Sequence, residues 1–210
     1  NLKFDVNGVN EVSRKFFGTL FNTYSFFAIY ANIDDFDINR KNIPIAKRPE
    51  IDRWIVSELN HLIKEVEEAF DKYDATKAAR NISTFVNDLL SNWYVRLSRR
   101  RFWKGTLNDD KLSAYHTLFE CLDKVCRLMA PLAPFFAERL FLDLNKENKL
   151  EFKDSVHLTI FPTSNPEHRD IELENKMNYA RDISSLALSI RKRNQIKVRQ
   201  PLSKIIVPVK

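Results

Sequence analysis

The sequence is poor in glycine and in cysteine. It has three glycines in 210 residues, which leaves no glycine-rich loop of the kind that cradles a phosphate group and favours long helices with few tight turns. The two cysteines, Cys121 and Cys126, lie five positions apart within a helical apolar pattern. We expect them to be reduced core residues rather than zinc ligands.

Targeting signals and catalytic motifs are also lacking. The sequence has no N-terminal secretion signal, no apolar run long enough to cross a membrane and no lipidation motif, which predicts a cytoplasmic protein without a membrane partner. No nucleophile motif occurs. The four histidines form no metal-binding pair: His61, His116, His157 and His168. We therefore expect no catalytic residue, no metal ligand and no cofactor within this chain.

Positive charge is concentrated in two stretches, although the net charge is only +6. Residues 91–104 and 190–204 together carry eleven Lys and Arg and no acid, so the rest of the chain is net acidic. The first stretch, SNWYVRLSRRRFWK, also carries four aromatic residues. Cations interleaved with aromatics are typical of surfaces that hold phosphates and stack on bases, so we expect an RNA site here rather than a lipid-binding face.

Apolar residues recur at intervals of three and four through most of the chain, which predicts an all-α helical bundle. A Pro inside a helix removes a backbone donor, so we expect a break near Ala130, before Pro131 and Pro134. A short extended or β piece is expected near 156–161 and a C-terminal strand at 204–209. The helices are expected at about 10–32, 50–70, 74–103, 111–144 and 170–194. The first is expected to be largely buried, and Asp74 is expected to cap the third.

These patterns divide the chain into two parts. Residues 9–195 are expected to form one helical domain, and residues 196–210 a basic linker followed by the start of a further domain. Because the sequence lacks an initiator Met and stops within an expected strand, we expect it to be a piece of a longer protein.

The basic end of the helix at 74–103 allows two interpretations. The core-facing stripe through Val86, Leu89, Trp93 and Leu97 continues into Arg100 at helical spacing, which would leave Arg100 and Arg101 to hold an anion. Alternatively, these cations pair with carboxylates of the preceding helix, such as Glu65, Glu67 or Glu68. Trp93 is equally consistent with core packing and with stacking on a base.

Four stretches resemble one family closely: YSFFAIYANID at 24–34, KAARNISTFVNDLLSNWYVRLSRRRFWKG at 77–105, LMAPLAPFFAERLF at 128–141 and IRKRNQIKVRQPLSK at 190–204. Together they are similar to the anticodon-binding domain of the isoleucyl-tRNA synthetases, which are class I aminoacyl-tRNA synthetases. The resemblance covers nearly the whole chain. It implies a helical bundle that grips the anticodon arm of an isoleucine tRNA, and no DNA partner.

The resemblance also implies which residues contact the tRNA. The first set is Asn92, Trp93, Arg96, Arg100 and Arg101, and the second is Arg191, Arg193, Lys197, Arg199 and Gln200. The composition of residues 91–104 adds Arg99, Trp103 and Lys104 to the first set. The HIGH-type and KMSKS-type ATP signatures of the family are absent. ATP, Mg²⁺ and any Zn²⁺ are therefore expected to bind other parts of the full-length enzyme.

We expect the chain to be a monomer. The alternative function is a helical scaffold whose basic helix end binds an acidic protein partner.

Overall fold

The computed structural model describes residues 5–39, 41–146 and 154–207. Within them all regular secondary structure is helical and no strand is present, which confirms the expected all-α bundle. The chain divides into two compact units, Asn1–Arg169 and Asp170–Lys210. None of the described helices is long and apolar enough to span a membrane.

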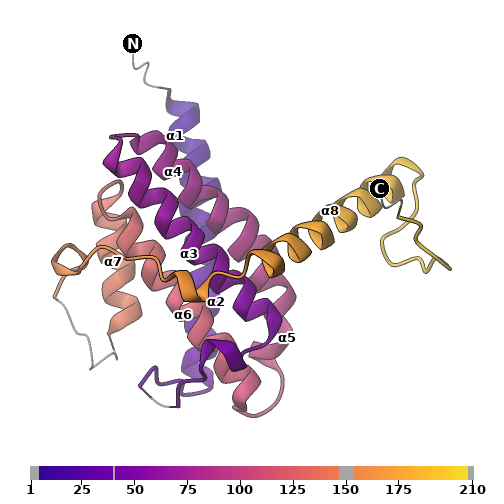
Figure 1. Ribbon diagram of the computed structural model, residues 1–210, viewed down its shortest axis with the longest axis horizontal. Helices are drawn as coiled ribbons and strands as arrows, with labels where there is room; N and C mark the ends of the chain where they lie inside the picture. The colour runs from indigo at the N-terminus through magenta and orange to yellow at the C-terminus, as the bar shows by residue number, and fades with distance from the viewer. Residues whose placement is uncertain (1–4, 40, 147–153, 208–210) are drawn as a thin grey trace. The chain divides into compact units, whose positions relative to one another are not determined.

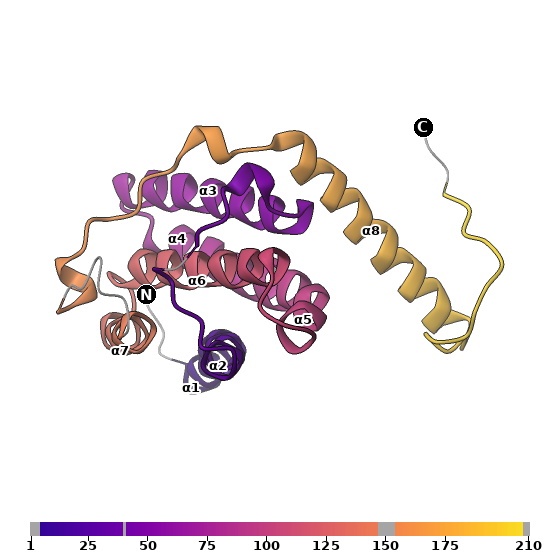
Figure 2. The same ribbon diagram turned by 90° about the horizontal axis from the view of Figure 1, so that it is seen from below.

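The centre of the first unit is formed by α3 (Glu50–Asp71) and α6 (Asp109–Met129). In Figure 2 these two helices run side by side, with α2 (Gly18–Ile33) and α7 (Pro134–Asn145) on the far side of α6 from α3. The core between them contains large, fully buried side chains such as Trp54 and Tyr115. Burial of this apolar surface is the main force that holds the bundle together.

The first helical segment starts earlier and is less buried than its sequence predicts. Helix α1 (Val6–Val12) is capped by Asp5, whose carboxylate accepts hydrogen bonds from two backbone N–H groups of the first turn. A π-helical turn, Ser13–Phe17, then leads directly into α2. Apolar side chains point in several directions around this segment, so only part of them can face the core. The prediction of a largely buried helix is wrong, since Val12 is 51% exposed.

The expected helix at 74–103 is continuous but not uniform. It consists of α4 (Ala75–Thr84), a π-helical stretch at Phe85–Val95 and α5 (Arg96–Trp103). The side chain of Asp74 caps its start, as predicted. Gly105 follows its end with a φ of +72°, a conformation that glycine adopts without steric cost.

The π-helical stretch moves the buried stripe of this helix by one residue. In a π-helix each hydrogen bond spans five residues instead of four, so every later side chain is displaced around the axis. After Val86 the buried residues are Leu90, Tyr94, Val95, Ser98 and Phe102. The predicted stripe through Leu89 and Trp93 to Leu97 is therefore wrong beyond Val86, and Leu97 is 52% exposed.

The proline-containing segment breaks where it was predicted to break. Helix α6 ends at Met129, and α7 begins at Pro134 after a turn in which the backbone N–H of Leu132 donates to the carbonyl of Met129 at 2.9 Å.

The expected β piece near 156–161 is not a strand. Val156–Leu158 forms a 3-10 turn, and the backbone N–H of Val156 donates to the carboxylate of Glu138 at 2.8 Å. The alternation of apolar residues here cannot produce a strand, because no described segment is extended beside it as a partner. The C-terminal strand is also wrong for residues 204–207, which have no regular structure; residues 208–210 lie outside the described residues.

The second unit consists of α8 (Ile171–Arg193) and the tail that follows it, shown in orange and yellow in Figure 1. The side chain of Asp170 caps the helix. At its other end, the guanidinium of Arg191 donates to the backbone carbonyls of Lys197 and Gln200, both at 2.9 Å. These bonds hold the start of the tail against the end of its own helix.

Candidate nucleic-acid interface

One arginine of the basic run faces inward. Both terminal nitrogens of Arg101 donate to the two carboxylate oxygens of Asp52 at 2.7 Å, and its Nε donates to the carboxylate of Asp110 at 3.1 Å. Such forked pairing is the strongest form of side-chain hydrogen bonding to a carboxylate. The donors of Arg101 are thus directed at two acids within the protein, which gives this side chain a structural role, and its expected contact with tRNA stays a prediction.

The Asp52 carboxylate is fully buried and also binds Tyr94, whose hydroxyl donates to Asp52 Oδ1 at 2.8 Å. Burial raises the pKa of Tyr94 well above its ordinary value, and the negative charge of Asp52 raises it further. Burial alone would lower the pKa of Arg101, but the hydrogen bonds and charge of Asp52 more than offset this and raise it. The tyrosine is therefore neutral and the arginine charged at any physiological pH.

A second anchor of α5 is aromatic. The buried ring of Phe102 packs edge-on against Phe26 of α2 and Tyr115 of α6, with ring centroids 5.1 and 5.0 Å apart. The hydroxyl of Tyr115 in turn donates to Asp34 at 2.5 Å, and the same carboxylate binds the buried ammonium of Lys111. Helix α5 is thus held along its inward side by an ion-pair cluster at Arg101 and an aromatic cluster at Phe102.

The opposite side of α5 carries exposed cations around one exposed indole. At about 100° per residue, four side chains fall within an arc of about 100°: Arg96, Arg99, Arg100 and Trp103. All four are exposed, and the indole of Trp103 is 53% exposed. We call these four residues the basic-aromatic face.

The side chains of this face remain available to a ligand. The guanidinium of Arg99 lies 5.9 Å from the ring centre of Phe26, a cation–π distance. For Arg100 no ion pair or side-chain hydrogen bond occurs with any described residue. An uncompensated cation beside an exposed indole can bind phosphate and stack on a base at the same time.

The remaining residues expected from the sequence lie in different surroundings. Asn92 is exposed one turn before Arg96, and Lys104 is exposed just after α5, so both border the basic-aromatic face. Trp93 is half-buried and lies on the side of Leu97, away from the centre of that face.

The second expected set belongs to the second unit. Arg191 is half-buried and its guanidinium is used within the tail, whereas four residues are exposed: Arg193, Lys197, Arg199 and Gln200.

Sequence reasoning missed the acids that organise this end of the bundle. It considered Glu65, Glu67 and Glu68 as partners of the basic run, but the acids that pair with it are Asp52 and Asp110. Glu65 instead accepts a hydrogen bond from the amide of Asn81 at 2.9 Å. The one available signal was an aspartate at position 52, three residues into a helix whose later positions bury apolar side chains.

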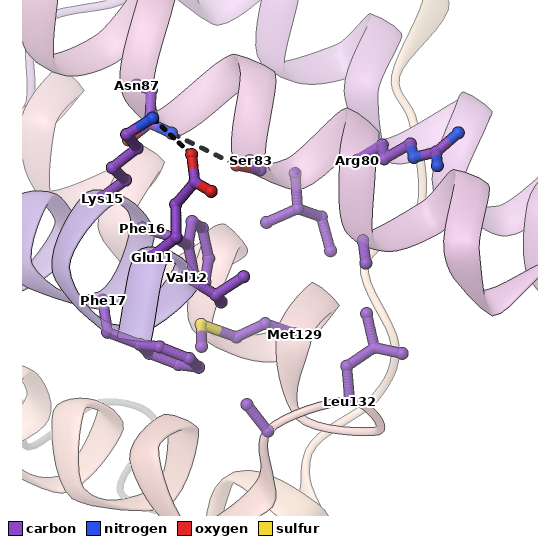
Figure 3. A pocket seen from close by; sticks show the side chains of 13 residues that line it. Glu11, Val12, Lys15, Phe16, Phe17, Arg80, Ser83, Asn87, Met129 and Leu132 are labelled. Atoms are coloured by element: carbon purple, nitrogen blue, oxygen red, sulfur yellow. Dashed lines mark hydrogen bonds and ion pairs between the residues drawn. The ribbon is translucent and has the colours of Figure 1, made fainter. Parts of the chain in front are cut away.

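A pocket of about 530 Å³ lies elsewhere in the first unit (Figure 3), between the N-terminal helical segment, α4 and the turn that follows α6. Its walls are mainly apolar and include Phe16, Ile82 and Met129. A Glu11–Lys15 ion pair borders it, and the hydrogen bond from Lys15, together with its charge, lowers the pKa of Glu11. Within the described residues no group of His, Cys, Asp and Glu could hold a metal ion.

Comparison with known proteins bears on this geometry. The profile of the family described as the anticodon-binding domain of tRNA ligase matches residues 52–206, a range that includes Asp52, Arg101 and the whole basic-aromatic face. The chain belongs to this family. The exposed cations of α5 therefore lie within the part of the chain that matches an anticodon-binding domain.

Several curated relatives are similar to the chain along its whole length. The isoleucine–tRNA ligase of Bacteroides thetaiotaomicron is 56% identical over 100% of the chain, which covers 18% of that relative. The isoleucine–tRNA ligase of Cytophaga hutchinsonii is also 56% identical over 100% of the chain and 19% of the relative. That of Dehalococcoides mccartyi strain 195 is 46% identical over 98% of the chain and 20% of the relative. The chain therefore spans about a fifth of the length of these relatives.

Proposed function

We propose that this anticodon-binding domain grips the anticodon arm of an isoleucine tRNA for an isoleucine–tRNA ligase, and that the basic-aromatic face of α5 is its main contact. The observation that carries the proposal is the outward display of Arg96, Arg99, Arg100 and Trp103 on a helix that is anchored on its other side. Family membership supports the RNA partner, and the 56% identical relatives support isoleucine as the amino acid.

The contacts divide by chemistry. The three guanidinium groups bind backbone phosphates, which fixes the position of the tRNA and makes binding depend strongly on salt. Trp103 stacks on a base that is splayed out of the anticodon loop, the part of a tRNA where bases are accessible. Asn92 and Lys104 extend the contact along the helix, and the exposed side chains of Arg193, Lys197, Arg199 and Gln200 form a second contact from residues 190–204.

Aminoacylation itself is assigned to other parts of the ligase. In this proposal residues 9–195 form the helical anticodon-binding domain, and residues 196–210 lead into a further domain. ATP, Mg²⁺ and any Zn²⁺ bind outside this chain. The ligase acts as a cytoplasmic monomer and has no DNA partner.

The test is a titration of the chain with isoleucine tRNA, another tRNA and a DNA duplex of similar length, each over a range of salt concentrations. The proposal predicts preferential binding of isoleucine tRNA, weakening steeply as salt rises. Equal binding of all three nucleic acids would contradict it. Tighter binding of an acidic protein than of any tRNA would instead favour the scaffold function.

A further inference from the structure

Asp52 binds side chains from two consecutive parts of one helix, the π-helical stretch Phe85–Val95 and the α-helix α5. Tyr94 is in the last turn of the π-helical stretch, and Arg101 is in α5, seven residues later. Both bind the same oxygen, Asp52 Oδ1, at 2.8 and 2.7 Å. A single buried carboxylate on α3 thus spans the junction between the π-helical and α-helical parts.

This junction determines which arginines face solvent. If residues 85–95 were ordinary α-helix, every later residue would be shifted by one position around the helix axis. Each residue would then lie where the next residue in the sequence lies in the structure. Arg100 would then lie against Asp52, and Trp93 would replace Tyr94. The hydroxyl of Tyr94 and the guanidinium of Arg101 can both bind Asp52 only in the observed rotation of the helix. In this rotation Arg99 and Arg100 point outward.

We propose that Asp52 is a positioning residue for RNA binding, which acts through Tyr94 and Arg101 to fix the rotation of α5. This inference rests on the proposed function of the basic-aromatic face. Asp52 is fully buried, so it acts through its neighbours and not by direct contact with RNA. The apolar pattern of the sequence does not by itself specify the rotation of this helix about its axis. Asp52 fixes that rotation, as a buried polar group can do.

A purely electrostatic account makes the opposite prediction. Asp52→Asn removes one negative charge beside Arg101 and makes the chain more basic, so it should tighten binding to an anionic tRNA. Loss of positioning should weaken binding instead, because the neutral amide cannot hold the guanidinium fork as strongly as a carboxylate does. The sign of the change in affinity therefore separates the two accounts.

The experiment measures isoleucine tRNA binding by the complete protein that carries this chain, over a salt series, with isoleucine-dependent ATP–pyrophosphate exchange as a control for the rest of the enzyme. The variants are Asp52→Asn and Tyr94→Phe, which removes only the hydroxyl that binds Asp52 and leaves the charge unchanged. Glu67→Gln is the matched control, since Glu67 is an exposed acid on the same helix and its loss adds the same charge. Arg100→Ala tests the interface itself.

The proposal predicts that Asp52→Asn weakens tRNA binding about tenfold and Tyr94→Phe about threefold, both without reducing the salt slope, since no phosphate contact is removed. Exchange activity and Glu67→Gln affinity stay at the unaltered level. Unchanged or tighter binding by Asp52→Asn and Tyr94→Phe overturns the positioning role, provided that Arg100→Ala weakens binding. If Arg100→Ala has no effect, the proposed interface fails, and the positioning role fails with it.

Discussion

Arg100 and Arg101 are neighbours in sequence, but the structure predicts opposite consequences for their removal. Arg101→Ala leaves the fully buried Asp52 carboxylate without its cation and removes four hydrogen bonds to Asp52 and Asp110. Breaking one partner of a buried ion pair costs about 3–5 kcal/mol. Since Arg101 is near the surface and the hydroxyl of Tyr94 still binds Asp52, we expect the lower end, about 3 kcal/mol.

Arg100→Ala removes an exposed cation that has no ion pair with a described residue, so its effect on stability should stay within about 0.5 kcal/mol. For a chain of this length, about 3 kcal/mol corresponds to a fall in Tm of about 6–12 °C. Thermal unfolding followed by circular dichroism measures both variants. In tRNA titrations, Arg100→Ala should reduce the salt slope by about 0.7–0.9.

Arg101→Ala, measured where it is fully folded, should leave that slope unchanged. Equal melting temperatures for the two variants, or a loss of salt slope confined to Arg101→Ala, would refute this division of roles. These opposite roles differ from the expectation from the sequence, in which Arg100 and Arg101 either both hold RNA or both pair with acids.

Three further predictions concern other parts of the chain. Burial lowers the pKa of His116, despite a hydrogen bond with the carbonyl of Lys41, so as the pH falls the unfolded state takes up a proton before the folded state does. The free energy of unfolding should therefore be highest above about pH 6.5 and fall as the pH drops below it. Denaturant titrations of His116→Gln should show a smaller fall. Burial raises the pKa of the thiols of Cys121 and Cys126 well above their ordinary value, so the folded chain should react with thiol reagents only as fast as it opens, and rapid labelling before unfolding would contradict the buried placement. The isolated chain should show no isoleucine-dependent ATP–pyrophosphate exchange and no hydrolysis of mischarged tRNA, since the ATP signatures are absent; detectable exchange by the pure chain would count against the assignment of catalysis to other parts.

Local signals in the sequence were sufficient for most helix boundaries. Asp74 and Asp170 cap the helices that were expected to start beside them, Gly105 follows the end of α5, and Pro131 marks the break after α6. Each depends on the hydrogen bonds or backbone angles of a few adjacent residues, which the residue type itself restricts.

The orientation of α5 was not predictable in the same way. Leu89 and Leu90 are both leucine, and Trp93 and Tyr94 are both aromatic, so two stripes one residue apart fit the apolar pattern equally well. The choice between them depends on a π-helical stretch and on Asp52, which is 49 residues before Arg101. Interactions between residues so far apart in sequence leave no periodic signal.

From the sequence, the candidate site could therefore be defined only as a stretch of the chain, and the use of its residues as tRNA contacts stays a prediction. The composition of residues 91–104 indicated a basic and aromatic surface. The structure distinguishes an outward group at Arg96, Arg99, Arg100 and Trp103 from an inward Arg101, a distinction that depends on the side to which each residue points.

The central claim, that the basic-aromatic face binds the anticodon arm, is tested most directly by cleavage from a tethered probe. Arg100→Cys introduces an exposed thiol, and an iron chelate can be attached to it selectively because both native thiols are buried. Glu67→Cys is the control, about 22 Å further along α3 than Asp52. The account predicts that radicals generated at position 100 cleave isoleucine tRNA in the anticodon stem and loop, with little cleavage there from position 67. Cleavage from position 100 that is confined to the acceptor arm, or no stronger than that from position 67, would contradict it.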